Sequence, residues 1–599
     1  MEIKKKPNEI FKEYEQGTEF KNSIGNRGIY EQSKMNERFY VGDQWHGVNA
    51  GNTRPLVRRN IIKRIGEYKI SSISASPVTV NYSADGIPNT VDMKETIDQT
   101  KKEMFSGSVP RGEITNEEID AVMDALTVYE KVTAERLKFT DLVTELAKNA
   151  YISGTSFLYT YWDSSIETGL FADQGKTTPI KGDINCQILN VENVILGDPN
   201  NNDIQSQPYI IISERKPLSV VKREAKQNRR KEADVESITA DEGAEYNAGD
   251  WGEKEPSENT RVTVLTKFWK EYDNDGNKYK IKAIRVTEKA VIRPEWDMNI
   301  RLYPLAKFVW LPRFSCGYGD SEITYLIPNQ IAINRALSSA VWSAMITGMP
   351  KTVVNRDLIL DPVTNDPGQI INLNAGTDYD VQKAIAYIQP PQFASQLQNV
   401  VADIANSTLS DSGANDAALG DLRPDNASAI IAMREAALMP MQVYQNRFYS
   451  CIEDIARIWA DFWLNMYGER PLKIQDKNGT QYLPFNAERY KYLIVNARVD
   501  VGASTLWGES VVIASLGNLL QSGIITPIQY LERIPKGTIP DITGLIDSLK
   551  EAQMQNAQAK EDFMVQFAQT HPQEYEAFKQ MPASEQQKLL EQYMKGGMT

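Results

Sequence analysis

The chain has 599 residues, 41% apolar and 24% charged, a composition typical of globular proteins with more than one core. Its 66 Lys and Arg against 79 Asp and Glu give a formal charge of −13, which disfavours a protein that coats nucleic acid through a basic surface. No segment approaches the roughly 18 consecutive apolar residues of a membrane-spanning helix, and no apolar run follows the cationic start. We therefore expect a protein of the cytosol or of a virion, neither secreted nor membrane-spanning.

The side chains that usually carry catalysis or bind metals are scarce. The two histidines, His46 and His571, lie far apart, and the sequence has no phosphate-binding loop, GxSxG turn or HExxH helix. The cysteines are widely spaced and lack CxxC spacing, which argues against disulfides and structural zinc and predicts buried thiols; they are Cys186, Cys316 and Cys451. We expect no enzymatic activity, no cofactor and no metal site.

Two segments imitate functional motifs without completing them. Gly317-Tyr318-Gly319 is followed by Glu322 where a dinucleotide fingerprint has its third glycine, so a turn is the better interpretation. Residues 271–276 (EYDNDG) begin like a calcium loop, but the twelfth position is Lys282 instead of glutamate. The flanking segments LTKFWKEY and KYKIKAIRV predict a β-hairpin.

The first part of the chain combines helices and strands. The first 60 residues are helix-rich up to NERFYVGDQW at 36–45, which the polar linker HGVNAGNTRP follows. The segment VRRNIIKRIGEYKISSI predicts a further helix. SPVTVNYSA alternates as a strand. Apolar residues at helical spacing predict one long helix over roughly 115–153, followed by the strand SFLYTYWD.

A change in charge interrupts the β-rich region that follows. Residues 222–231 carry six cationic side chains, and residues 232–258 carry ten acidic ones against a single lysine. Opposed blocks of this kind predict a solvated, partly disordered excursion. Strands then resume from 260 to about 314.

The segment from Asp320 onwards alternates helices with other elements. Asp320 is predicted to cap a helix that ends at Gly348, with a break or kink near Pro328. A β-rich stretch at 349–394 precedes a second helix, a small-residue acidic loop at 411–426 and a third helix of about 40 residues, bent at Pro440. Beyond it we expect a hairpin with an Asn478-Gly479 turn, a strand region and helices from about 506.

This order of elements resembles that of the portal proteins of tailed bacteriophages over nearly the whole chain. The resemblance rests on YVGDQW at 40–45, AYISGTSFLYTYWD at 150–163, the strand and turn from Val191 to Pro199, and the helix, β-module, helix, loop and long helix of 320–467. It implies a mixed α+β portal fold with wing, stem, clip and crown regions.

The resemblance also implies a division of the chain into regions. They are an N-terminal wing at 1–319, a stem helix at 320–348, a β-rich clip at 349–394, a second stem helix at 395–410, a tunnel loop at 411–426, the long wing helix and wing strands at 427–506, and a helical crown at 507–599.

By the same resemblance, about twelve copies form a ring at one capsid vertex, and double-stranded DNA passes through its channel during packaging and ejection. The implied partners are further copies of the chain, the major capsid protein, the terminase large subunit, a head–tail adaptor and a scaffolding protein, with no membrane. The protein would belong to the virion and assemble in the host bacterial cytoplasm.

The tunnel loop is our candidate for the narrowest part of the channel. Asp411, Asp416, Asp421 and Asp425 outweigh Arg423, which gives a net charge of −3 per copy. A lining rich in Lys and Arg would bind DNA through counterion release and resist its passage, so an acidic wall suits a conduit. An ordinary solvated connection between helices is the alternative.

The stem and its end supply further expectations. Apolar residues spread around the helix in IAINRALSSAVWSAMITGM, as suits a helix pressed between neighbouring subunits, and Ala and Ser permit close approach. Lys351 and Arg356, just past this helix, are candidates for contact with phosphate or an adaptor, and a surface salt bridge is the alternative.

Two other functions remain open at this point. Another ring or scaffold component of a virion, such as an adaptor or capsid protein, would share the charge and the lack of catalytic motifs. A nuclease or ATPase subunit of the packaging machine would need a phosphate loop, which is absent, or clustered acidic metal ligands, which the sequence does not distinguish from its acidic background.

Overall fold

The computed structural model describes residues 7–49, 51, 54–74, 79–83, 116–171, 179–241, 261–273, 279–348, 395–414, 427–476, 479–486, 495–500 and 506–534, with short runs between 351 and 388 and between 542 and 550. The chain divides into two compact units, residues 1–500 and 501–599.

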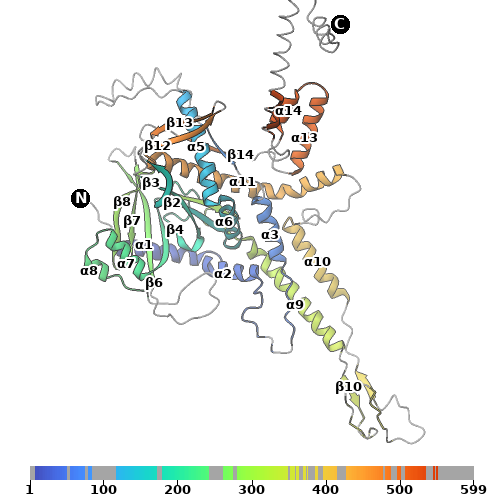
Figure 1. Cartoon of the computed structure of the whole chain (residues 1–599). Coiled ribbons are helices and arrows are strands. Elements are labelled where there is room, and N and C mark those ends of the chain that lie inside the picture. The colour runs from blue at the N-terminus through green and yellow to red at the C-terminus, as the bar shows by residue number, and fades with distance from the viewer. Residues whose placement is uncertain are drawn as a thin grey trace, which may run out of the picture. The chain divides into compact units, whose positions relative to one another are not determined.

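Two antiparallel sheets form the centre of the first unit (Figure 1). The smaller one has the order β3-β2-β9, with β2 (Thr155–Phe171) between β3 (Pro179–Asn190) and β9 (Leu305–Val309). The larger one has the order β4-β5-β6-β7-β8, from β4 (Val194–Leu196), which a 3-10 turn at Val191–Asn193 precedes, to β8 (Val291–Asp297). The strands between them are β5 (Tyr209–Pro217), β6 (Arg261–Tyr272) and β7 (Tyr279–Val286).

The β6–β7 pair confirms the predicted hairpin in place of a calcium loop. The last register pair before the connection is Tyr272↔Tyr279, and the Lys282 ammonium pairs with Glu271 on the neighbouring strand. The middle of β6 is buried without interruption from Val264 to Trp269, and β7 buries Ile281, Ala283, Ile284 and Val286, as expected of strands in the interior of a sheet.

Five helices belong to the N-terminal part of this unit. They are α1 (Pro7–Ser23), α2 (Gly28–Val41), α3 (Ile61–Ser74), α5 (Asn116–Leu137) and α6 (Phe139–Ser153). Of these, α1, α5 and α6 contact the sheets, and α2 and α3 pack on α6. The single long helix predicted over 115–153 is wrong, because the chain breaks at Lys138, whose φ of 50° is left-handed. Apolar spacing continues on both sides of the break, so the periodicity alone did not show it.

The charged segment is folded over the part that the structure describes. Helices α7 (Leu218–Gln227) and α8 (Glu232–Glu236) bury a small apolar cluster against the larger sheet: Val221, Ala225, Val235 and Ile238 pack with Val262, Val264, Ala290 and Ile292. The expectation of a solvated excursion is therefore wrong for 222–241. The rest of the segment, 242–258, lies outside the described residues.

The long helix α11 (Ala427–Met466) supplies the aromatic part of the core. Trp459 and Trp463 are buried, and the Trp459 ring meets Phe139 of α6 at 5.1 Å between centroids. Pro440 lies inside this helix and does not end it. Strand β1 (Thr79–Ser83) pairs with β14 (Asn496–Asp500), so segments far apart in sequence complete the same unit.

The remaining elements agree with the expected hairpin and helical C-terminal region. Strands β12 (Glu469–Asp476) and β13 (Gly479–Asn486) pair antiparallel up to Asp476↔Gly479, while Asn478 itself lies outside the described residues. In the second unit, α13 (Leu506–Gln521) and α14 (Pro527–Arg533) surround a cluster that includes Leu531, Ile534 and Ile546.

Candidate functional site

Two antiparallel helices, α9 (Glu322–Gly348) and α10 (Ser395–Asp411), extend away from the sheets of the first unit, and a β-pair lies between them in sequence (Figure 1). Helix α9 leads to β10 (Lys351–Val354), which pairs with β11 (Ile385–Ile388) in the register Lys351↔Ile388, and α10 returns along α9. The Asn329 amide donates to the Thr408 hydroxyl at 3.1 Å, which sets the axial register between α9 and α10.

The start of α9 is capped by Ser321, so the predicted Asp320 cap is wrong. The Ser321 hydroxyl accepts the Ile323 N–H at 3.1 Å and donates to the Tyr151 carbonyl at 2.6 Å. Asp320 is unavailable for capping, because its main chain pairs with Leu311 and its carboxylate binds Arg313. The cap therefore also ties α9 to the end of α6.

A buried ion pair joins the first turn of α9 to α3. The Lys69 ammonium lies 2.6 Å from the Glu322 carboxylate, and both side chains are buried. The other carboxylate oxygen accepts the Trp310 indole N–H at 3.1 Å, and the Lys69 ammonium lies 5.2 Å from the centre of the Tyr444 ring. Each charge thus has partners in a site that excludes water, which orients α9 on the body of the unit.

Polar side chains at a spacing of four residues fasten the middle of α9 to the main chain of residues 57–61. Gln330 accepts the Ile61 N–H at 3.0 Å and donates to the Arg59 carbonyl at 2.6 Å. Asn334 accepts the Arg59 N–H at 3.1 Å, and Ser338 accepts the Val57 N–H at 2.9 Å. Main-chain N–H groups of the extended segment thereby find hydrogen-bond acceptors among the side chains of α9.

The YVGDQW segment contributes to this attachment. Gly42, with φ at 100°, ends α2, and the buried Gln44 carboxamide accepts the Asn334 amide at 2.5 Å. The Trp45 indole donates to the Val57 carbonyl at 3.0 Å. Sequence reasoning missed this role of Gln330, Asn334 and Ser338; the available signal was their i, i+4, i+8 spacing in an otherwise apolar helix.

The outer parts of α9 and α10 leave apolar side chains in solvent. Val341, Met345 and Ile346 near the end of α9 are 39–48% exposed, and Val400 on α10 is 47% exposed. The two helices carry little charge in return: Glu322 and Arg335 on α9, and Asp403 and Asp411 on α10. Such a surface is typical of a subunit contact.

The structure tests few of the candidate channel residues. Asp411 is the exposed last residue of α10, and Lys351 is the first residue of β10. Four others lie outside the described residues together with most of the tunnel loop: Asp416, Asp421, Arg423 and Asp425. Arg356 also lies outside them, so the roles of these residues stay predictions.

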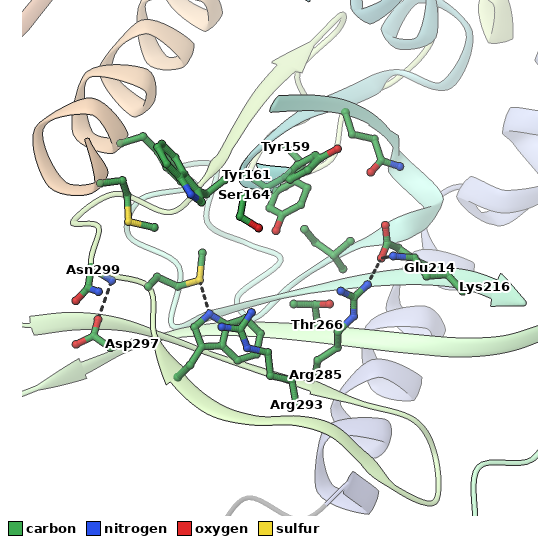
Figure 2. A pocket seen from close by; sticks show the side chains of 17 residues that line it. Tyr159, Tyr161, Ser164, Glu214, Lys216, Thr266, Arg285, Arg293, Asp297 and Asn299 are labelled. Atoms are coloured by element: carbon green, nitrogen blue, oxygen red, sulfur yellow. Dashed lines mark hydrogen bonds and ion pairs between the residues drawn. The ribbon is translucent and has the colours of Figure 1, made fainter. Parts of the chain in front are cut away.

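A separate pocket of about 590 Å³ lies where β2, β5, β7, β8 and α11 meet (Figure 2). Tyr159 and Tyr161 stack at 5.6 Å between centroids and lie across the pocket from Arg285 and Arg293. Arg285 pairs with Glu214 at 2.7 Å. Arg293 stacks on the Trp296 ring at 3.9 Å, and burial lowers the pKa of its guanidinium.

The chemistry of this pocket favours structure or binding over catalysis. Its two carboxylates are engaged, Glu214 with Arg285 and Lys216, and Asp297 with the Lys280 ammonium at 3.3 Å. Burial raises the pKa of Tyr159 and Tyr161, so both hydroxyls stay protonated at neutral pH. No histidine or cysteine lines the pocket as described, and no pairing of a nucleophile with a free base is seen there.

The three cysteines do not line this pocket, and they differ in burial. Cys451 is buried as predicted, whereas Cys186 and Cys316 are only half-buried. Burial raises the pKa of Cys186 to about 11, which keeps it a thiol. Over the described ranges, no group of three or more metal-ligating side chains gathers, and no helix there has the length and hydropathy to cross a membrane.

Comparison with known proteins adds one match to these observations. The family model described as "Phage P22-like portal protein" matches residues 209–595, more than half of the chain. No curated protein matches the sequence. The matched range runs from β5 through α9, α10 and α11, so it includes the two antiparallel helices and the β-pair between them.

Proposed function

Since the chain belongs to the P22-like phage portal protein family, we propose that about twelve copies form a ring at one vertex of the capsid and that double-stranded DNA passes through its channel during packaging and ejection. The family establishes a structural component of a phage virion. The observation that carries the proposal is the match over 209–595, which takes in both projecting helices.

In the proposed ring, α9 and α10 are the stem and the residues between them are the clip. The stem helices take 320–348 and 395–410, and the clip takes 349–394. The wing comprises 1–319 and 427–506, and the crown comprises 507–599. The antiparallel helices with a β-pair at their end, and the separation of a C-terminal unit at residue 501, support this division.

The low charge of the stem supports a role as a conduit. Together α9 and α10 contain three acidic residues and one basic residue, Arg335. Each Lys or Arg that neutralises a phosphate releases counterions and adds salt-dependent affinity, so a wall with few cations lets DNA move along it. The exposed apolar residues near the end of α9 suit contacts between neighbouring stems.

The tunnel loop at 411–426 would form the narrowest part of the channel, starting at Asp411 where α10 ends. Its excess of aspartates would repel the DNA backbone at short range. Lys351 and Arg356, at the clip, would contact phosphate or an adaptor. The clip would receive the terminase large subunit and then the head–tail adaptor, and the wing would meet the major capsid protein and the scaffolding protein during assembly in the host cytoplasm.

Mass measurement of the native assembly tests the proposal. The expected particle has close to twelve times the 67.5 kDa of the single chain. A protein that stays monomeric at micromolar concentration would contradict the proposed ring. ATP hydrolysis by the purified chain is a second measurement: we expect none above background, and appreciable turnover would indicate a packaging motor subunit instead.

A further inference from the structure

Helix α9 has a different neighbour on each of two opposite flanks. On one flank, Asn329 bonds α10. On the other, Ile331, Asn334 and Arg335 line a groove of about 530 Å³ beside α2 and the residues that follow it. Ile331 is two residues beyond Asn329, about 200° around the helix, which places the groove and α10 on opposite sides of α9.

The groove is basic. Four cations line it, namely Arg27, Lys34, Arg38 and Arg335, against the two acidic side chains Glu31 and Asp43. Arg335 is exposed and makes no ion pair within the part of the chain that the structure describes. Val48, at 51% exposure, gives the groove an apolar rim.

The outer face of α10 is acidic. Its inner face buries Val401, Ala405 and Leu409. Asp403 is two residues from Val401 and therefore lies on the far side of the helix, where it is exposed. Asp411 is exposed as well, and α10 contains no Lys or Arg.

Arg335 and Asp403 stand at the same level along the two helices. The Asn329–Thr408 bond sets the register. Arg335 lies six residues from Asn329, about 9 Å along α9, and Asp403 lies five residues from Thr408, about 7.5 Å along α10. Because the helices are antiparallel, both displacements run in the same direction. Within the described part of one chain, no ion pair joins the two side chains.

We propose that the groove receives the outer face of α10 from a neighbouring copy of this chain, with Arg335 of one copy paired to Asp403 of the next. A ring is built from heterologous contacts, in which one flank of each subunit meets the opposite flank of its neighbour. Rotation about the ring axis keeps equivalent residues at one height. If the two helices run along that axis, as the proposed stem requires, residues that share a level within the chain also share it across the interface. The inference rests on the proposed ring and identifies which surfaces close it.

The experiment uses complementary charge reversals in the full-length protein. R335E alone brings two carboxylates together across the interface, and D403R alone brings two guanidinium groups together. Each variant should need at least about tenfold more protein for half-assembly, measured by native mass spectrometry. An equal mixture of the two should assemble like wild type, with the variants present in equal numbers, because each then meets its complement.

Three further measurements make the outcome decisive. The R335E/D403R double variant should form wild-type rings, and circular dichroism of each single variant should match wild type. R223E on α7 and D124R on α5 are matched controls, since both residues are exposed and lack an ion pair among the described residues; they should leave assembly unchanged.

The possible failures are distinguishable. If wild type forms rings and the single variants assemble equally well, or the mixture behaves as two unassembled populations, the interface is wrong while the ring stands. If R335E assembles normally and instead loses affinity for DNA, the groove binds phosphate and the proposal is wrong. A wild-type protein that never assembles would overturn the ring and the interface together.

Discussion

Lys21 is the most deeply buried cation among the described residues of the N-terminal helices. Its ammonium donates to the main-chain carbonyls of Val191 at 2.5 Å and Glu192 at 3.1 Å, next to the rings of Tyr30 and Tyr318. Burial lowers the pKa of Lys21 to about 7, although the nearby Glu192 carboxylate raises it in part. This lysine joins α1 to the turn that precedes β4.

The lowered pKa makes stability depend on pH in a defined direction. Between pH 7 and 10.5 the unfolded chain holds the Lys21 proton and the folded chain does not, so the free energy of unfolding rises with pH. Relative to Lys21→Met, wild type should gain up to about 1.4 kcal/mol per pH unit over this window. Urea unfolding of both proteins at pH 7, 8 and 9 measures the difference. A difference that stays constant or shrinks as pH rises would contradict the assigned burial.

At the scale of elements, the attachment of α9 to α3 depends on the Lys69–Glu322 pair. Removing one charge leaves the other buried without a partner, so Glu322→Gln should lower the free energy of unfolding by about 3–5 kcal/mol. The measurement is the shift of the urea midpoint. Glu167→Gln is the matched control, because its ion pair with Lys181 is largely exposed and should matter by less than about 1 kcal/mol. Equal shifts in the two variants would show that burial of the first pair contributes nothing.

The tunnel loop offers a second prediction at this scale. Lysine at positions 411, 416, 421 and 425 would replace a repelling wall with a binding one, and DNA packaging should slow at least tenfold. Asparagine at the same four positions should leave the rate within about twofold. The readout is the length of DNA packaged per unit time by capsids whose portal rings are first shown to be intact. Packaging at the wild-type rate with the lysine variant would show that these residues do not line the channel.

Periodicity predicted the elements whose apolar faces are continuous. It located α9, α10, α11 and the β6–β7 hairpin, because burial on one face leaves a regular spacing in sequence. It failed where a single main-chain angle decides, as at Lys138, and where charge concealed a few apolar contacts, as at Val221 and Val235 in the charged segment.

Contacts between distant segments could not be predicted from local pattern. Nothing in the sequence near Glu322 indicates that it pairs with Lys69. The polar row of Gln330, Asn334 and Ser338 can be interpreted only once residues 57–61 are known to lie against it. Ser321 caps α9 in place of the predicted Asp320, because the main chain of Asp320 pairs with Leu311. The candidate channel residues beyond Asp411 remain predictions from the sequence.

At the scale of the whole molecule, the family match and the projecting helices support one account. A body of two sheets and surrounding helices holds α9 and α10 through a buried ion pair, a serine cap and an amide ladder. The projecting helices themselves are weakly charged and partly apolar. In the proposed ring, this combination suits a subunit that presents two flanks to its neighbours and a third surface to DNA.

An electron cryomicroscopy map of the purified assembly tests the central claim most directly. The account predicts a hollow ring of about twelve copies in which α9 and α10 surround the channel and the 411–426 loop points into it. A map with these helices on the outer rim, or a channel wall covered by Lys and Arg side chains, would contradict it.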